Sequence, residues 1–132
     1  MTIISPQPET GDFIPTATEA NPPDAEYPLF SLRHVDKRYC ISACQKTEKV
    51  SFVNKLLKWS GMTWTELRLA HRHGLGYELI GTLDAKLPAS APTGAQAIAF
   101  RFHDKAPVVG YRDGNVFYAV WFDRQFTLYD HG

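Results

Sequence analysis

Alternating apolar and polar positions in the last third of the chain predict an antiparallel sheet. Between residues 98 and 103, large apolar side chains occupy every second position, which is typical of a strand with one buried face. Three further apolar stretches follow at residues 108–112, 115–122 and 126–129, and short turn-forming stretches separate them. We therefore expect a four-stranded antiparallel meander.

The Asp-Gly pair at residues 113–114 is the strongest hairpin signal in the chain. A two-residue loop there places Arg112 opposite Asn115, and this register assigns each side chain of the hairpin to one face of the sheet. If residues 124–125 also form a two-residue turn, Tyr129 lies on the face opposite to that of Arg112. A slip of one residue would reverse this arrangement, so both remain open.

Helical spacing of apolar residues predicts a helix over residues 47–59, capped at its start by Thr47. Two rows of apolar side chains run side by side along this helix. The rows are Val50, Val53 and Leu57, and Phe52, Leu56 and Trp59. Because adjacent rows form one surface, we expect them to make a wide buried face.

A second, shorter helix and an N-terminal strand complete the predicted fold. Thr63 and Glu66 have the spacing of a capping box, and Gly74 or Gly76 ends the helix that follows. Imperfect alternation over residues 28–41 predicts the first strand region. The expected fold is α+β, with an N-terminal strand, a helical hairpin and the C-terminal four-stranded antiparallel meander packed on the helices.

Charge and proline content divide the chain into a tail, residues 1–27, and a single α+β domain, residues 28–132. Residues 1–28 carry five acids and no lysine or arginine, whereas the rest of the chain carries all 14 basic residues against nine acids. We expect the tail to be flexible, because proline and acid enrichment leaves little apolar surface to offset the entropy of ordering. The basic excess of the domain is compatible with a polyanionic partner, although it is also ordinary in size.

The sequence gives no sign of a membrane, a metal or a cofactor. It has no apolar run of about 18 residues and no secretory signal, so we expect a cytoplasmic protein without membrane contact. Cys40 and Cys44 have a spacing that is not typical of zinc or redox sites, and we expect two buried thiols. His71 and His73 could complete a Cys2His2 set, but that spacing matches no standard zinc pattern. Phosphate-binding glycine motifs and nucleophile elbows are also missing from the sequence.

Basic and aromatic residues of the meander are the remaining candidates for chemistry. Metal-free RNA cleavage needs a general base, cations that stabilise the charged intermediate and a general acid, and such residues can supply all three. The candidates are Arg101, Arg112, Tyr129 and His131 as catalytic residues, and His71, Arg72, His73, His103 and Arg124 as substrate-binding residues. The alternative is that these are ordinary solvated side chains, and that Tyr129 belongs to the core.

The chain resembles the RelE/ParE superfamily of bacterial toxins in the order of its predicted elements and in its C-terminal stretches. These stretches are a strand with Arg101, the hairpin VVGYRDGNVFYAVWFDR and the final FTLYDH. The resemblance implies a metal-independent endoribonuclease that cleaves mRNA, often on the ribosome, and that has an antitoxin partner. It implies that Arg101 and Arg112 hold the scissile phosphate and that Tyr129 or His131 supplies acid/base chemistry. The stretch GMTWTELRLAHRHGLGYELI also looks like parts of small uncharacterised bacterial proteins.

Two other functional classes fit the sequence. The chain could be a non-catalytic protein-binding module of a bacterial mobile element, an inhibitor or regulator that binds through the meander or the acidic tail. It could also be an assembly protein that associates through an edge strand at residues 126–129. The acidic tail could fold back over the basic domain as an autoinhibitor or a mimic of a partner, or it could be simply disordered.

Overall fold

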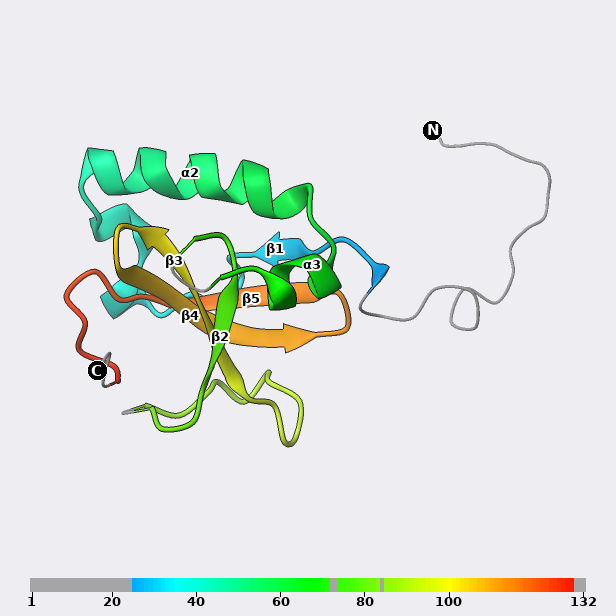
Figure 1. The fold of residues 1–132 in the computed structure, drawn as a ribbon. Helices are drawn as coiled ribbons and strands as arrows, with labels where there is room; N and C mark the ends of the chain where they lie inside the picture. Colours follow the sequence, from blue (N-terminus) through cyan, green and yellow to red (C-terminus); the bar gives the residue numbers. More distant parts are fainter. Residues whose placement is uncertain (1–24, 72–73, 84, 130–132) are drawn as a thin grey trace.

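A five-stranded mixed sheet forms the centre of the protein (Figure 1), in a computed structural model that describes residues 25–71, 74–83 and 85–129. The strands are β1 (Leu29–Ser31), β2 (Tyr77–Ile80), β3 (Ala97–His103), β4 (Ala106–Asp113) and β5 (Val116–Phe122). Their spatial order is β1-β5-β4-β3-β2, in which β1 runs parallel to β5 and all other pairs are antiparallel. The predicted α+β class and the N-terminal strand are confirmed.

Two 3₁₀ turns and two α-helices lie between β1 and β2 in the chain. They are the short 3₁₀ turns η2 (Lys37–Tyr39) and η3 (Ile41–Ala43), and the helices α2 (Lys46–Ser60) and α3 (Trp64–Leu69). α2 lies along one face of the sheet and packs on β3, and α3 packs beside β2 (Figure 1). None of the helices in the described residues is long and apolar enough to cross a membrane.

The antiparallel meander begins one strand earlier than predicted. It runs through β2, β3, β4 and β5, whereas the predicted strand at residues 126–129 does not form. The Asp123 carboxylate accepts hydrogen bonds from the backbone N–H groups of Thr127 (2.9 Å) and Leu128 (3.0 Å), so these donors are satisfied locally rather than by a neighbouring strand. Phe126 also has a φ of 59°, which interrupts any extended run. The edge strand on which the assembly hypothesis depended is therefore not formed.

The β4–β5 hairpin turns at residues 114–115, one residue later than predicted. Gly114 adopts a φ of 64°, and Arg112 pairs with Phe117 rather than with Asn115. This register differs from the predicted one by two residues, an even number, so the faces predicted for the tip of the hairpin hold. Further along, a bulge beside Val109 and Gly110 puts Trp121 on the face opposite to the predicted one.

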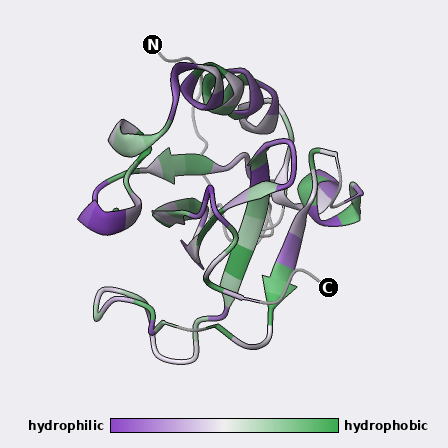
Figure 2. Cartoon of the chain, turned by 90° about the vertical axis from the view of Figure 1, so that its left-hand side faces the viewer, coloured by the Kyte–Doolittle hydropathy of each residue, from purple (hydrophilic) through white to green (hydrophobic). Residues whose placement is uncertain are grey.

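Hydrophobic clusters cover both faces of the sheet. The first lies between α2 and the sheet and is rich in aromatic rings, with Trp59 at 4.8 Å from Phe100 and Phe52 at 4.9 Å from Phe122 between ring centroids. The second lies on the opposite face, where side chains from residues 83–95 and Tyr129 pack over it. The hydropathy colouring in Figure 2 shows the central strands as the most apolar part of the fold.

One apolar row of α2 does not join the core, so the prediction of a single wide buried face is wrong. Phe52 and Trp59 are buried, but Val50, Val53 and Leu57 are 52%, 59% and 77% exposed. The sheet lies on one side of the helix only, and this row points to the other side.

The predicted N-cap of the first helix is wrong, whereas that of the second helix is confirmed. The first helix is capped by Gln45, which forms a capping box with Glu48, and not by Thr47 as predicted. The Thr63–Glu66 capping box before α3 is confirmed.

Candidate functional site

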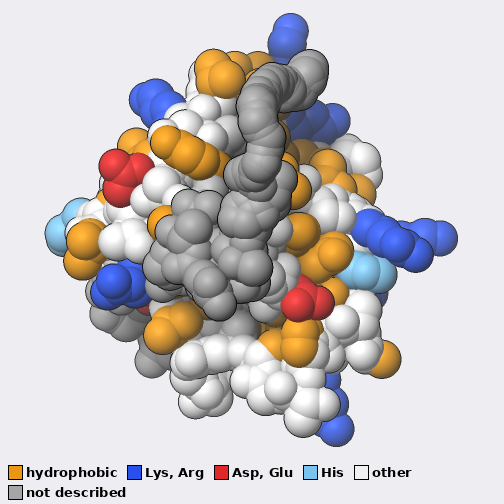
Figure 3. Space-filling model, turned by 90° about the vertical axis from the view of Figure 1, so that its right-hand side faces the viewer, with side chains coloured by type: hydrophobic (Ala, Val, Ile, Leu, Met, Phe, Trp, Pro, Cys, Tyr) orange, Lys and Arg blue, Asp and Glu red, His pale blue; other side chains and the backbone are white. Residues whose placement is uncertain are grey.

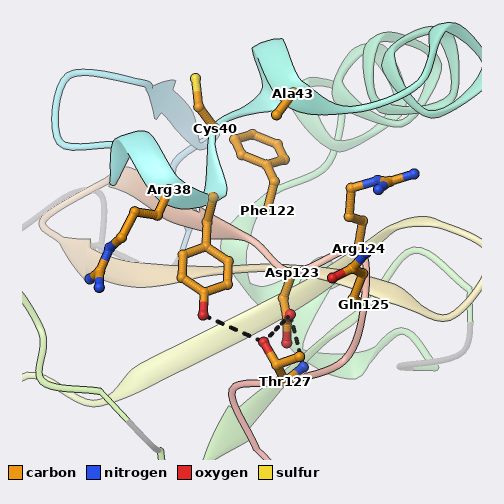
Figure 4. Close-up of a pocket in the computed structure, with 9 residues that line it drawn as sticks. Arg38, Cys40, Ala43, Phe122, Asp123, Arg124, Gln125 and Thr127 are labelled. Carbon is orange, nitrogen blue, oxygen red and sulfur yellow. Dashed lines mark hydrogen bonds between the residues drawn. The ribbon is translucent and has the colours of Figure 1, made fainter.

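A small hollow of about 160 Å³ lies between the η2–η3 turns and the segment that follows β5 (Figure 4). Its polar lining consists of Arg38, Tyr39, Cys40, Asp123, Arg124, Gln125 and Thr127. The chain meets itself here, because the 3₁₀ turns precede α2 whereas the other wall follows the last strand. Of the predicted site residues that the structure describes, only Arg124 lines this hollow.

Asp123 holds one wall of the hollow in place. It is 1% exposed, and its carboxylate accepts hydrogen bonds from the N–H groups of Thr127 and Leu128 and from the Thr127 hydroxyl (3.2 Å). The Thr127 hydroxyl in turn lies 3.5 Å from that of Tyr39 on η2. Asp123 therefore fixes the backbone after β5 and positions two hydroxyl groups at the hollow.

Two arginines flank the hollow, and each is held by a carboxylate. Arg38 donates to Asp36 from Nε (3.3 Å) and Nη2 (3.0 Å), and these bonds lower the pKa of Asp36 to about 2. Arg124 donates from Nε to Glu48 (2.9 Å), and Figure 4 shows the side chains of Arg38 and Arg124 directed away from each other. Much of the positive charge around the hollow is thus neutralised by these two acids.

Glu48 is a buried carboxylate that joins α2 to the segment after β5. Burial alone would raise its pKa, but the hydrogen bonds from the Gln45 N–H and from Arg124 outweigh burial and lower the pKa below its ordinary value. The positive field of His103 acts in the same direction. Of the predicted substrate-binding residues, Arg124 therefore bonds directly to this carboxylate, whereas His103 lies 3.5 Å from the Asp104 carboxylate.

The two cysteines are free and differ in environment. Cys44 is buried, as predicted, and burial raises its pKa. Cys40 is only half-buried, contrary to the prediction, and hydrogen bonds from the side chain and backbone of Ser42 lower the pKa of its thiol. The difference arises because Cys40 lies between the two 3₁₀ turns at the rim of the hollow, whereas Cys44 points into the core beneath α2.

The predicted phosphate-holding arginines do not share a face of the sheet. Arg101 on β3 is 9% exposed and alternates with Phe100, so it lies on the face away from α2. Arg112 on β4 lies opposite Phe117 on the face toward the helices, and its guanidinium carbon is 4.2 Å from the centroid of the Trp64 ring. Its Nε also donates to the Gly114 carbonyl (2.7 Å).

The remaining predicted site residues are scattered or lie outside the described residues. Tyr129 packs against the second cluster, whereas Arg112 lies on the opposite face of the sheet, beside Trp64. His71 is exposed after α3, and its carbonyl accepts from the N–H groups of Gly74 and Gly76. The residues outside the described ranges are Arg72, His73 and His131. Among the described residues, no group of three or more His, Cys, Asp or Glu side chains is placed to hold a metal ion.

The second candidate site is the outward face of α2, which we define by Val50, Val53 and Leu57. All three are more than half exposed. The lysines around them are Lys46, Lys49 and Lys58, all exposed. Beside this face lies an open groove of about 430 Å³, lined in part by Val50, Ser51 and His103. In Figure 3, hydrophobic and basic side chains lie together at the top of the molecule, where α2 runs.

The spacing of the apolar residues in the sequence already carries a signal for this exposed face. Successive residues of a helix are separated by about 100°, so Val50, Val53 and Leu57 centre on the side opposite to Phe52 and Trp59. Six apolar residues spread over both sides cannot all face one sheet. The lysines at 46 and 49 mark the exposed side.

Comparisons with known proteins leave the function to be argued from these sites. No protein-family model matches the chain, and no curated protein or solved structure matches it.

Proposed function

We propose that the protein is a non-catalytic binding module, an inhibitor or regulator, that binds another protein through the outward face of α2. The observation that carries this proposal is the row of three exposed aliphatic side chains on a helix whose opposite side builds the core. Their spacing of i, i+3 and i+7 is that of a helix which inserts into an apolar groove of a partner. Contiguous apolar surface of this kind is typical of interaction sites.

The arrangement of the candidate catalytic residues favours binding over turnover. Arg101 and Arg112 lie on opposite faces of the sheet, and Tyr129 packs over the second cluster. Transition-state stabilisation requires these groups to converge on one reacting phosphate. Arg101 and Arg112 cannot do so without unfolding the sheet.

Affinity purification of the full chain from its native host tests the proposal. We expect a protein partner in stoichiometric amount and no RNA. Leu57→Glu should abolish its recovery, because a carboxylate in the centre of an apolar contact costs about 2 kcal/mol or more, about 30-fold in Kd. Leu79→Glu is the matched control, because Leu79 is 58% exposed on β2, away from α2. Recovery of RNA instead of a protein, or equal loss in both variants, would contradict the proposal.

A second candidate function is a toxin-like, metal-independent endoribonuclease acting on mRNA or at the ribosome. The hollow beside Tyr39 favours it, because the Tyr39 and Thr127 hydroxyl groups lie 3.5 Å apart there and Arg124 lines the same hollow. Arg124 donates a hydrogen bond from its Nε to Glu48. The other N–H donors of its guanidinium could bind a phosphate. Tyr39 would then protonate the leaving oxygen, and an antitoxin would occupy the outward face of α2.

Cleavage of a single-stranded RNA by the purified chain, with chelator present, tests this candidate. Tyr39→Phe should lower the rate about 100-fold or more, as for loss of a general acid. Tyr27→Phe removes the same hydroxyl from an exposed position and should leave the rate unchanged. Absence of cleavage, or equal cleavage by all three proteins, would exclude a nuclease site in the hollow.

A further inference from the structure

We propose that the chain's own acidic segment, residues 9–14, docks on the outward face of α2 and competes there with the partner. The sequence of this segment is Glu-Thr-Gly-Asp-Phe-Ile, which sets two carboxylates beside two large apolar side chains. The competition with a partner rests on the proposed function.

The point at which the chain joins the described fold lies next to the end of α2. The Glu26 carbonyl accepts a hydrogen bond from the N–H of Trp64 (3.1 Å), the first residue of α3, and α2 ends at Ser60. Figure 1 shows this start of the coloured chain beside α3, near the C-terminal end of α2. The segment is thus tethered close to the proposed docking face.

The tether is long enough to reach every turn of the helix. α2 has 15 residues, so at 1.5 Å per residue it is about 22 Å long. The chain between residues 14 and 25 spans up to about 36 Å when extended, at about 3.3 Å per residue. Phe13 and Ile14 can therefore contact the row of Val50, Val53 and Leu57 along its whole length.

The charges of the two surfaces are complementary. Residues 1–24 carry four acids and no lysine or arginine. The outward face of α2 is rimmed by three exposed lysines, and the single acid in the sequence of α2, Glu48, is buried and paired with Arg124. The same rim disfavours a second copy of the chain as the occupant, because two such faces would bring lysines against lysines.

The physical consequence is a regulated surface. A tethered segment acts at an effective concentration in the millimolar range, so even a weak contact covers the face for much of the time. A partner must then displace it with a segment that offers the same combination of acidic and apolar groups. Salt should weaken the docking, because the charged rim is exposed and screened.

Amide NMR spectra of full-length variants test the docking. Phe13→Ser with Ile14→Ser removes the apolar contact, and Ile3→Ser with Ile4→Ser is the matched control, because Ile3 and Ile4 precede the docking segment. We expect the first variant, and not the control, to shift the amide signals of residues 50–57 relative to the wild type. Raising the salt concentration from about 0.05 M to about 0.5 M should shift the wild-type signals in the same direction.

Three results would overturn the docking. The signals of α2 could be the same in both variants, or they could shift equally in both. Differences that grow with protein concentration would identify a second copy of the chain as the occupant. Partner recovery is a separate readout: recovery by the Phe13→Ser, Ile14→Ser variant should exceed that by the wild type, and equal recovery would overturn the competition. If no variant recovers a partner while the α2 signals still shift, the docking stands and the proposed function fails.

Discussion

At the scale of single residues, the two cysteines should differ in reactivity. The hydrogen bonds from Ser42 lower the pKa of Cys40, whereas burial raises the pKa of Cys44. We expect iodoacetamide at neutral pH to modify Cys40 first, and Cys44 only after unfolding. Peptide mapping by mass spectrometry over a range of pH values measures both rates.

The variant Ser42→Ala provides the control for this difference. It removes the side-chain hydrogen bond to the Cys40 thiol, so the midpoint of the Cys40 rate profile should move to higher pH. The Cys44 rate should not change. A faster reaction at Cys44 than at Cys40 in the native protein would contradict the assigned burial of these residues.

At the scale of elements, α2 and α3 each pack one tryptophan into the core, with unequal hydrogen bonding. The Trp64 Nε1 donates to the Asn115 carbonyl (3.1 Å), and its ring also contacts the Arg112 guanidinium. Trp59 is fully buried, and among the described residues its Nε1 has no hydrogen-bond acceptor. A buried donor without an acceptor opposes folding, so the two indoles contribute differently.

We expect Trp64→Phe to destabilise the protein by about 1–3 kcal/mol and Trp59→Phe by about 1 kcal/mol or less. Both changes shorten a buried aromatic side chain, but only the first breaks a hydrogen bond and a cation–π contact. Urea unfolding of the two variants gives the comparison directly. An equal loss, or a larger loss for Trp59→Phe, would show that packing rather than hydrogen bonding dominates at these positions.

The elements that the sequence predicted correctly are those with local signals. The start of α3 follows from the side-chain bonds between Thr63 and Glu66, and the faces at the tip of the hairpin follow from strand alternation and Gly114. The elements it missed depend on distant contacts. β2 is only four residues long and forms by pairing with β3, and residues 126–129 are held by the buried Asp123 carboxylate instead of by a neighbouring strand.

The candidate site was harder to predict than the fold for the same reason. Arg124 appeared in the sequence only as a basic residue in a turn, whereas its partner Glu48 lies 76 residues away on α2. The hollow also needs Tyr39 and Thr127, which come from opposite ends of the domain and carry no shared motif. Spacing along the chain cannot report such a site, because the tertiary fold alone brings its walls together.

At the scale of the whole molecule, two carboxylates join the turns before α2 and the first turn of α2 to the end of the sheet. Asp36 accepts from the Trp121 indole (3.3 Å) as well as from Arg38, and its own N–H donates to the Val120 carbonyl (2.8 Å). Glu48 pairs with Arg124 beyond β5. Both carboxyl groups have a folded-state pKa below the ordinary value. Their interactions with Trp121 and Arg124 hold these elements against the end of the sheet, and both interactions should weaken in acid.

These lowered pKa values predict that the protein loses stability in acid. A carboxyl group with a depressed folded-state pKa contributes stability that is fully present above its unfolded pKa, about 4, and that is lost as the pH falls through the folded-state value, about 2 for Asp36. We expect the free energy of unfolding to be nearly constant from about pH 7 to about pH 5. Below that it should fall. Asp36 should account for about 1 kcal/mol of this loss, because solvent screens its pair with the exposed Arg38. Asp36→Asn should lower stability at pH 7 and flatten the curve, whereas Asp113→Asn, at an exposed hairpin position, should keep the wild-type slope. Urea unfolding at each pH measures this dependence. If the free energy of unfolding of Asp36→Asn falls with pH as steeply as that of the wild type, Asp36 does not stabilise the packing of the turns on the sheet.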